Sequence, residues 1–102
     1  MNYELVLQWP ASSIENYDAM ISVEDLLIEE LSDGIDIEGH DGGSGQVNIF
    51  IRTDSPDKTF RAVKGILEDR TEWSEIKVAY REIAKSEYTI IWPKNLTKFE
   101  VV

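Results

Sequence analysis

The stretch "IDIEGHDGGSGQVNIFIRT", residues 35–53, decides the fold because it holds two alternating runs separated by glycines. Residues 35–40 and residues 46–53 each alternate apolar with polar side chains. A period of two is typical of a strand that buries one face. Two such runs with a glycine-rich connection predict a β-hairpin. We expect Gly42 and Gly43 to supply the positive φ angles of its turn.

The patterns on both sides of this hairpin extend it into a complete domain. Residues 3–9 alternate in the same way, and residues 17–31 carry apolar side chains at helical spacing. Downstream, residues 56–70 predict a second helix, and residues 76–81 and 88–93 predict two more strands. The order is β-α-β-β-α-β with an extra C-terminal strand. It predicts one α+β domain over all 102 residues, a ferredoxin-like sandwich in which both helices cover one face of an antiparallel sheet.

Strand parity assigns the side chains to the two faces of this sheet. The helices are expected to cover Leu5, Leu7, Ile35, Ile37, Val47, Ile49, Ile51, Ile76 and Val78. The other face is expected to be open and to carry Glu4, Val6, Gln8, Asp36, Glu38, His40, Asn48, Phe50, Arg52, Lys77, Ala79 and Arg81. Its mixture of apolar and charged groups favours either a homodimer formed through this face or a solvated surface.

Charge is distributed unevenly along the chain. Residues 1–51 contain 11 acidic and no basic residues, whereas residues 52–102 contain 9 acidic and 10 basic residues. The resulting net charge of −10 repels phosphates and anionic lipids, so we expect neither nucleic-acid nor membrane binding. The chain has no cysteine, no secretory signal pattern and no run of about 18 apolar residues. These features predict a cytoplasmic protein.

The acidic first half favours a basic protein partner. A charged surface steers association, and a buried aromatic side chain can anchor the complex. The residues expected to contact the partner are Glu24, Asp25, Glu29, Glu30 and Phe50. This hypothesis describes a non-enzymatic interaction domain, for example an immunity-type inhibitor. The simpler interpretation is that the acidity serves solubility alone.

The alternative hypothesis is a small enzyme, or a domain that binds a small molecule or a metal, built around the single histidine. Its residues are His40, Asp41, Glu38, Arg52 and Arg81. Imidazole and carboxylate groups suit a transition metal, but Asp36, Glu38 and His40 recur at intervals of about 6.6 Å along one strand face. Because that spacing is wide for one ion, we predict no metal and no other cofactor. The plain interpretation is a strand-end histidine that bonds to a loop backbone.

Several segments carry a resemblance to a known family. They are "LQWPASSI", "YDAMISVEDLLIEEL", "GHDGGSGQVNIFIRTDSP", "VAYREI" and "YTIIWP". With these segments the chain resembles a family of small, acidic, uncharacterised bacterial proteins, and the similarity spans nearly its whole length. The most distinctive part is Gly39–Gly45 followed by Asn48–Ile51. The resemblance implies a bacterial, cytoplasmic, ferredoxin-like protein, and it implies no activity or site.

Overall fold

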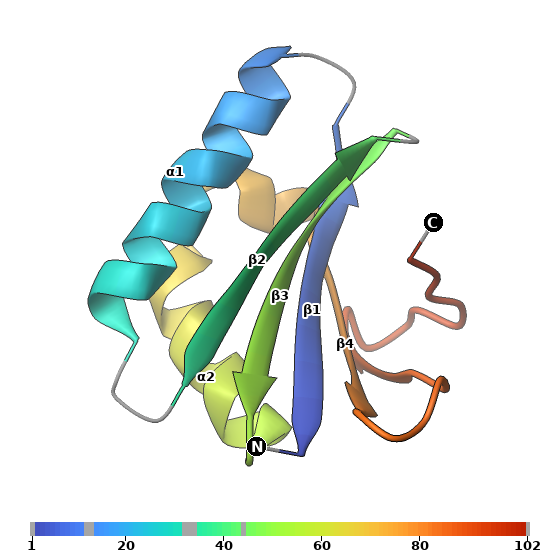
Figure 1. The fold of residues 1–102 in the computed structure, drawn as a ribbon. Helices are drawn as coiled ribbons and strands as arrows, with labels where there is room; N and C mark the ends of the chain where they lie inside the picture. Colours follow the sequence, from blue (N-terminus) through green and yellow to red (C-terminus); the bar gives the residue numbers. More distant parts are fainter. Residues whose placement is uncertain (1, 12–13, 32–34, 44, 102) are drawn as a thin grey trace.

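A computed structural model of the chain describes residues 2–11, 14–31, 35–43 and 45–101. Its five strands form one sheet in the order β2-β3-β1-β4-β5, with every neighbouring pair antiparallel, and two helices pack on it (Figure 1). The elements are β1 (Tyr3–Pro10), α1 (Ile14–Glu30), β2 (Asp36–Gly43), β3 (Gln46–Thr53), α2 (Pro56–Leu67), a short 3₁₀ helix η1 (Thr71–Glu75), β4 (Lys77–Glu82) and β5 (Thr89–Trp92). The predicted α+β class, with an antiparallel sheet and two helices, is confirmed.

The hydrophobic core lies between the helices and one face of the sheet. Both helices cover the same face, while the C-terminal segment, residues 93–101, lies on the other (Figure 1). In the core, β1 is the central strand, with Leu5 opposite Ile51 and Leu7 opposite Ile49. The helices contribute Met20, Val23, Leu27, Val63 and Leu67. Fully burying each such side chain contributes about 1.5–3 kcal/mol, so this layer dominates the stability of the domain.

The inward-facing residues were predicted well from alternation. The buried core includes Leu5, Leu7, Val47, Ile49, Ile51, Ile76 and Val78. The remaining two, Ile35 and Ile37, are half-buried and pack against its border. The second helix ends at Leu67, before the predicted Arg70, because the chain there turns towards η1. Among the described residues, no helix is both long enough and apolar enough to cross a bilayer.

A β-bulge in β2 overturns one prediction. Ile37 pairs with Ile51, but the next pair joins Gly39 to Phe50, so Glu38 is an extra residue in β2. Gly39 has a φ of 147°, a conformation that side chains rarely adopt. Beyond the bulge the parity is reversed, because an extra residue shifts every later side chain to the other face. His40 therefore lies opposite Ile49 on the helix-covered face. The prediction that it shares a face with Glu38 was wrong.

The glycines of the hairpin also differ from their predicted role. Gly42 and Gly43 are strand residues paired with Val47 and Gln46, so β2 continues beyond His40. Gly43 has a positive φ of 134°, but Gly42 does not have a positive φ. A Cβ atom at Gly42 would lie 2.9 Å from the ring of Tyr17, so this glycine provides space for α1. Ser44 lies outside the described residues.

The sheet face opposite the helices is covered in part, although it was predicted to be open. Val6 and Ala79 on this face are fully buried. The C-terminal segment crosses this face, where the Gln8 side-chain amide donates to the backbone oxygen of Glu100 over 2.7 Å. Phe99 of this segment lies tilted against Tyr88, the residue before β5, with ring centroids 5.1 Å apart. A second chain docking on the covered part of this face would have to displace the segment. The homodimer through this face stays a prediction.

Candidate functional site

The single histidine lies between strand β2 and helix α1, where two side chains of the helix meet its ring. His40 Nδ1 lies 2.9 Å from Oε1 and 3.1 Å from Oε2 of Glu24. The other ring nitrogen, Nε2, lies 3.0 Å from the hydroxyl oxygen of Tyr17. The side chain of Glu24 is 11% exposed and that of His40 is 29% exposed. We call Tyr17, Glu24 and His40 the histidine cluster.

The two ring nitrogens of His40 have different roles in the histidine cluster. When the imidazole is neutral, Nδ1–H donates to the Glu24 carboxylate and Nε2 accepts the proton of the Tyr17 hydroxyl. The carboxylate thereby selects the tautomer in which Nε2 is the base. Within the described part of the chain, no group of three or more His, Asp or Glu side chains is arranged to hold a metal ion. The arrangement is suited to proton transfer.

A row of alternating charges crosses the opposite face of the sheet. Arg52 lies between Asp36 and Glu4 in neighbouring strands, and Arg81 lies on the far side of Glu4. Arg52 Nε is 2.8 Å from Oε1 of Glu38, and Arg81 Nε is 3.2 Å from Oε1 of Glu4. Both arginines, predicted as residues of the alternative enzyme or ligand-binding site, are therefore engaged by carboxylates of the chain.

This charged row borders a pocket of about 430 Å³. The pocket is lined by Glu4, Glu38, Gly39, His40, Phe50, Arg81 and Tyr88. The predicted Glu38 and Arg81 meet at this pocket, whereas Asp41 and Arg52 are not among its lining residues. His40 borders the pocket, but both nitrogens of its ring bond to side chains of α1 on the other side of the sheet. The sequence interpretation missed Glu4 and Tyr88. Cross-strand pairing with two arginines could have indicated Glu4, but no sequence pattern indicates Tyr88.

Glu4 is electrostatically unusual within this pocket. Its pKa is raised above the ordinary glutamate value, first because burial penalises the carboxylate and also because Glu38 lies beside it. The guanidinium of Arg81 opposes this effect without cancelling it. The pKa of Tyr88 is also raised, by burial and then by the charge of Glu4. Glu4 is thus the carboxyl group of this pocket that holds its proton most readily relative to solution.

Replacing Glu4 by glutamine is expected to change how stability depends on pH. Because the folded protein holds this proton more tightly than the unfolded chain, Glu4 makes folding less favourable as pH rises from the ordinary pKa through the raised one. Glutamine mimics the protonated form and removes that loss. Urea unfolding at several values between about pH 4 and pH 7 should show the difference in unfolding free energy shifting in favour of Glu4→Gln as pH rises.

The matched control is Glu87→Gln, which removes a carboxylate from an exposed position. The effect assigned to Glu4 is the pH dependence of Glu4→Gln beyond that of this control. A Glu4→Gln difference that is independent of pH, or that shifts in favour of the wild type, would contradict the assignment.

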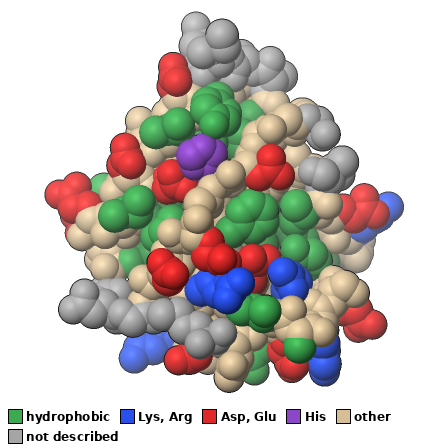
Figure 2. Space-filling model, in the orientation of Figure 1, with side chains coloured by type: hydrophobic (Ala, Val, Ile, Leu, Met, Phe, Trp, Pro, Cys, Tyr) green, Lys and Arg blue, Asp and Glu red, His purple; other side chains and the backbone are tan. Residues whose placement is uncertain are grey.

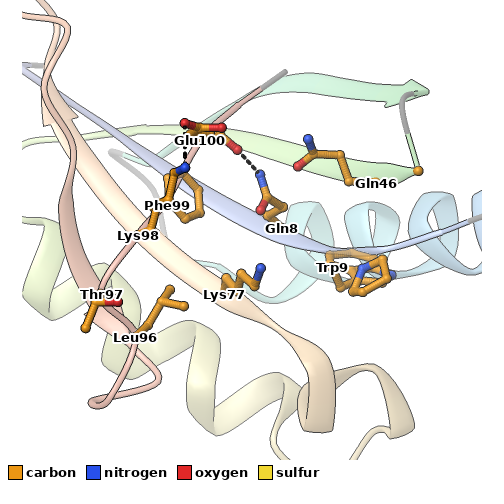
Figure 3. A pocket seen from close by; sticks show the side chains of 11 residues that line it. Gln8, Trp9, Gln46, Lys77, Leu96, Thr97, Lys98, Phe99 and Glu100 are labelled. Atoms are coloured by element: carbon orange, nitrogen blue, oxygen red, sulfur yellow. Dashed lines mark hydrogen bonds and ion pairs between the residues drawn. The ribbon is translucent and has the colours of Figure 1, made fainter.

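A second pocket, of about 550 Å³, lies between the end of β1 and the C-terminal segment (Figure 3). Its lining residues are Gln8, Trp9, Pro10, Gly45, Gln46, Lys77, Leu96, Thr97, Lys98, Phe99 and Glu100. Its C-terminal wall is held by the bond from Gln8 to Glu100 and by a Lys98–Glu100 ion pair of 3.5 Å. Its walls combine amide, ammonium and apolar groups.

The exposed face of α1 carries most of the predicted partner-binding residues. Asp25 and Glu29 are exposed there, next to Ile28, which is 59% exposed, and Glu30 is exposed on another side of the last turn. No basic residue occurs in the last turn of this helix. In the space-filling view, the histidine lies among acidic and hydrophobic side chains (Figure 2). Glu24, by contrast, is buried against His40, so the predicted set does not form one surface.

Phe50 lies apart from the other predicted partner-binding residues. It is half-buried in the pocket on the sheet face opposite the helices. It therefore cannot anchor a partner that docks on α1. Ile28 is the exposed apolar side chain nearest to the acidic residues in sequence, and alternation-based reasoning missed it because it falls outside the core stripe of the helix.

Comparison with models of protein families, with curated proteins and with solved structures gives no match for this chain.

Proposed function

We propose that this chain is a non-enzymatic interaction domain whose α1 face binds a basic protein. The observation that carries the proposal is the exposed group Asp25, Ile28 and Glu29, called here the acidic face, while Glu30 is exposed on another side of the last turn. Residues spaced by three and four along a helix are neighbours, so Ile28 stands beside Asp25 and Glu29. An apolar centre with a charged border is the usual anatomy of a protein interface.

The position of the acids within α1 adds a second argument. Glu29 and Glu30 occupy the last turn, where the carbonyl groups already give the helix end a partial negative charge. Acidic side chains at this end cost the isolated helix stability, and basic ones would favour it. A cationic partner would neutralise both carboxylates and relieve that repulsion. An immunity-type inhibitor of a basic protein, proposed by analogy of size and charge, is one concrete form of this function.

We also infer a ferredoxin-like arrangement with an additional edge strand. It is supported by β3, which lies between β1 and β2, and by β1, which lies between β3 and β4, so two β-α-β units interleave. In this interpretation β5 is the addition beyond β4. The family resemblance, the bacterial origin and the cytoplasmic location belong to the same proposal. The absence of cysteine fits a reducing compartment.

Reversing charge on the acidic face should weaken partner binding selectively. The test captures partners from a lysate of the source cells with the wild-type chain, identifies them by mass spectrometry and titrates the purified partner. Close charge pairs across interfaces contribute enough for Asp25→Lys with Glu29→Lys to raise Kd by at least about tenfold. Wild-type binding should also weaken when NaCl rises from about 0.05 to about 0.5 M, because salt screens exposed charges.

The matched control reverses two exposed acids outside the acidic face, Asp69→Lys with Glu87→Lys, and changes the net charge equally. We expect this control to alter Kd by less than the acidic-face variant does. Equal effects of the two variants would show that only net charge matters. A captured partner whose affinity is insensitive to salt would contradict the proposal.

A further inference from the structure

We infer that the histidine cluster makes Tyr17 a nucleophile, which accepts an acyl group from an uncharged activated ester. The cluster has the geometry of a nucleophile, a base and a group that orients the base. The Tyr17 hydroxyl lies 3.0 Å from Nε2 of His40, and Glu24 holds Nδ1 of the same ring at 2.9 Å. Both distances are within the range in which a base can take a proton.

The surroundings hold these three groups in place. Glu24 is buried in α1, two helical turns after Tyr17, so both side chains lie on the stripe that faces β2. The bulge at Glu38 turns His40 towards that stripe. The Tyr17 ring rests against Gly42 and meets the His40 ring edge to face at a centroid distance of 5.7 Å. Tyr17 is nevertheless 38% exposed, so a reagent in solution can reach it.

The transfer follows directly from this geometry. The Tyr17 hydroxyl oxygen forms a bond to the carbonyl carbon of the ester while its proton passes to Nε2 of His40. The bond from that carbon to the leaving alkoxide or phenolate breaks, and the leaving group departs with the electron pair. The product is O-acyl Tyr17 beside a protonated His40, whose charge is balanced by Glu24. Tyr17 is the nucleophile, His40 is the base and Glu24 is a positioning residue.

The charge of the region selects the chemical class of the donor. Residues 1–51 contribute 11 acids and no base, and α1 carries exposed Asp18 and Asp25 two turns apart. A field of this sign lowers the local concentration of anionic donors such as acyl phosphates or phosphoryl compounds. An uncharged ester meets no such barrier. The geometry therefore points to neutral acyl donors and away from phosphoryl transfer.

The experiment treats the folded chain with 4-nitrophenyl acetate, follows the release of 4-nitrophenolate and locates acetyl groups by peptide mass spectrometry. Tyr17 should be acetylated first, and Tyr3, Tyr80 and Tyr88 serve as internal references. Because exposure alone could favour Tyr17, the decisive variant is His40→Asn. Its amide can still donate to Glu24, but it offers no base to the phenol.

General-base assistance is typically about 10²–10⁴-fold, so His40→Asn should slow acetylation of Tyr17 at least about tenfold and leave Tyr88 unchanged. Tyr17→Phe should abolish the fast phase of nitrophenolate release. Acetyl phosphate, an anionic donor, should not acetylate Tyr17 faster than Tyr88. Circular dichroism and urea unfolding of each variant establish that it is folded before its rate is compared.

The role of Glu24 is tested by two substitutions, of which one keeps the length of the side chain and the other keeps its charge. Glu24→Gln keeps the length of the side chain and loses the charge, whereas Glu24→Asp keeps the charge and loses length. A positioning role through the carboxylate predicts that Glu24→Asp retains more of the Tyr17 rate, while a purely structural role predicts the reverse. The inference is overturned if Tyr17 reacts equally fast in His40→Asn, or if it reacts no faster than Tyr88 in the wild type.

Discussion

Replacing Val6 by aspartate is expected to remove most of the stability of the domain. Val6 is fully buried on the sheet face away from the helices, between Phe50 and Ala79 of the neighbouring strands. An uncompensated charge in such a position costs about 3–5 kcal/mol, against a total of about 5–15 kcal/mol for a typical domain. Urea unfolding followed by circular dichroism at neutral pH measures the loss.

The control is Ile28→Asp, because Ile28 is 59% exposed on α1. The same change of side chain there should cost no more than about 1 kcal/mol, chiefly because it adds an acidic group near the C-terminal end of α1. If Val6→Asp were as mild as this control, Val6 would be accessible to water in solution. That result would mean that the C-terminal segment does not cover the sheet as described.

The neighbouring substitution, Leu7→Ala, tests the opposite face of the same strand. Leu7 is fully buried and lies between Ile49 and Val78 under the helices. Removing a buried leucine side chain leaves a cavity and costs about 2.7–5 kcal/mol. We expect a lower urea midpoint with an unchanged slope, because the surface exposed on unfolding stays nearly the same.

Tryptophan fluorescence provides a check within the same experiment, since it reports on the buried Trp9 together with Trp73 and Trp92, which pack against the core. Fluorescence and circular dichroism should give one coincident transition for Leu7→Ala if the domain unfolds as a unit. A loss below about 1 kcal/mol would contradict the packing of this layer, as the cavity cost could then not apply.

The parts of the fold that depend on local alternation could be predicted from the sequence. Leu5, Leu7, Val47, Ile49 and Ile51 face the helices because a strand turns every second side chain to the same face, whatever its partners are. The helices follow for the same reason, since their apolar spacing reflects local geometry. These local patterns are enough to predict the α+β class and the layer of two helices on the sheet.

The site depends on pairing between strands, which no local pattern contains. The bulge at Glu38 exists only in the register of β2 against β3, so the sequence alone placed His40 on the wrong face. Once His40 turns towards α1, Glu24 becomes its buried partner and is lost from the predicted partner-binding set. Two features of the sequence could have indicated this contact between His40 and α1. They are the glycine directly after Glu38 and the tyrosine seven residues before Glu24.

The covering of the outer face was missed for a different reason. Residues 93–101 form no helix or strand, and their apolar side chains follow no period. Their position is fixed by single contacts, such as the bond from Gln8 to the backbone of Glu100. Contacts of this kind arise from the assembled tertiary structure, so composition and spacing give no indication of them.

The bulge in β2 has a consequence for how this protein meets other molecules. β2 is the outermost strand beside β3, and its far edge offers backbone groups that could template another strand. The irregular spacing at Glu38 and the exposed acids Asp36, Glu38 and Asp41 make that edge a poor template. Strand addition at the β2 edge is therefore disfavoured, and a partner that meets this edge is expected to contact its side chains.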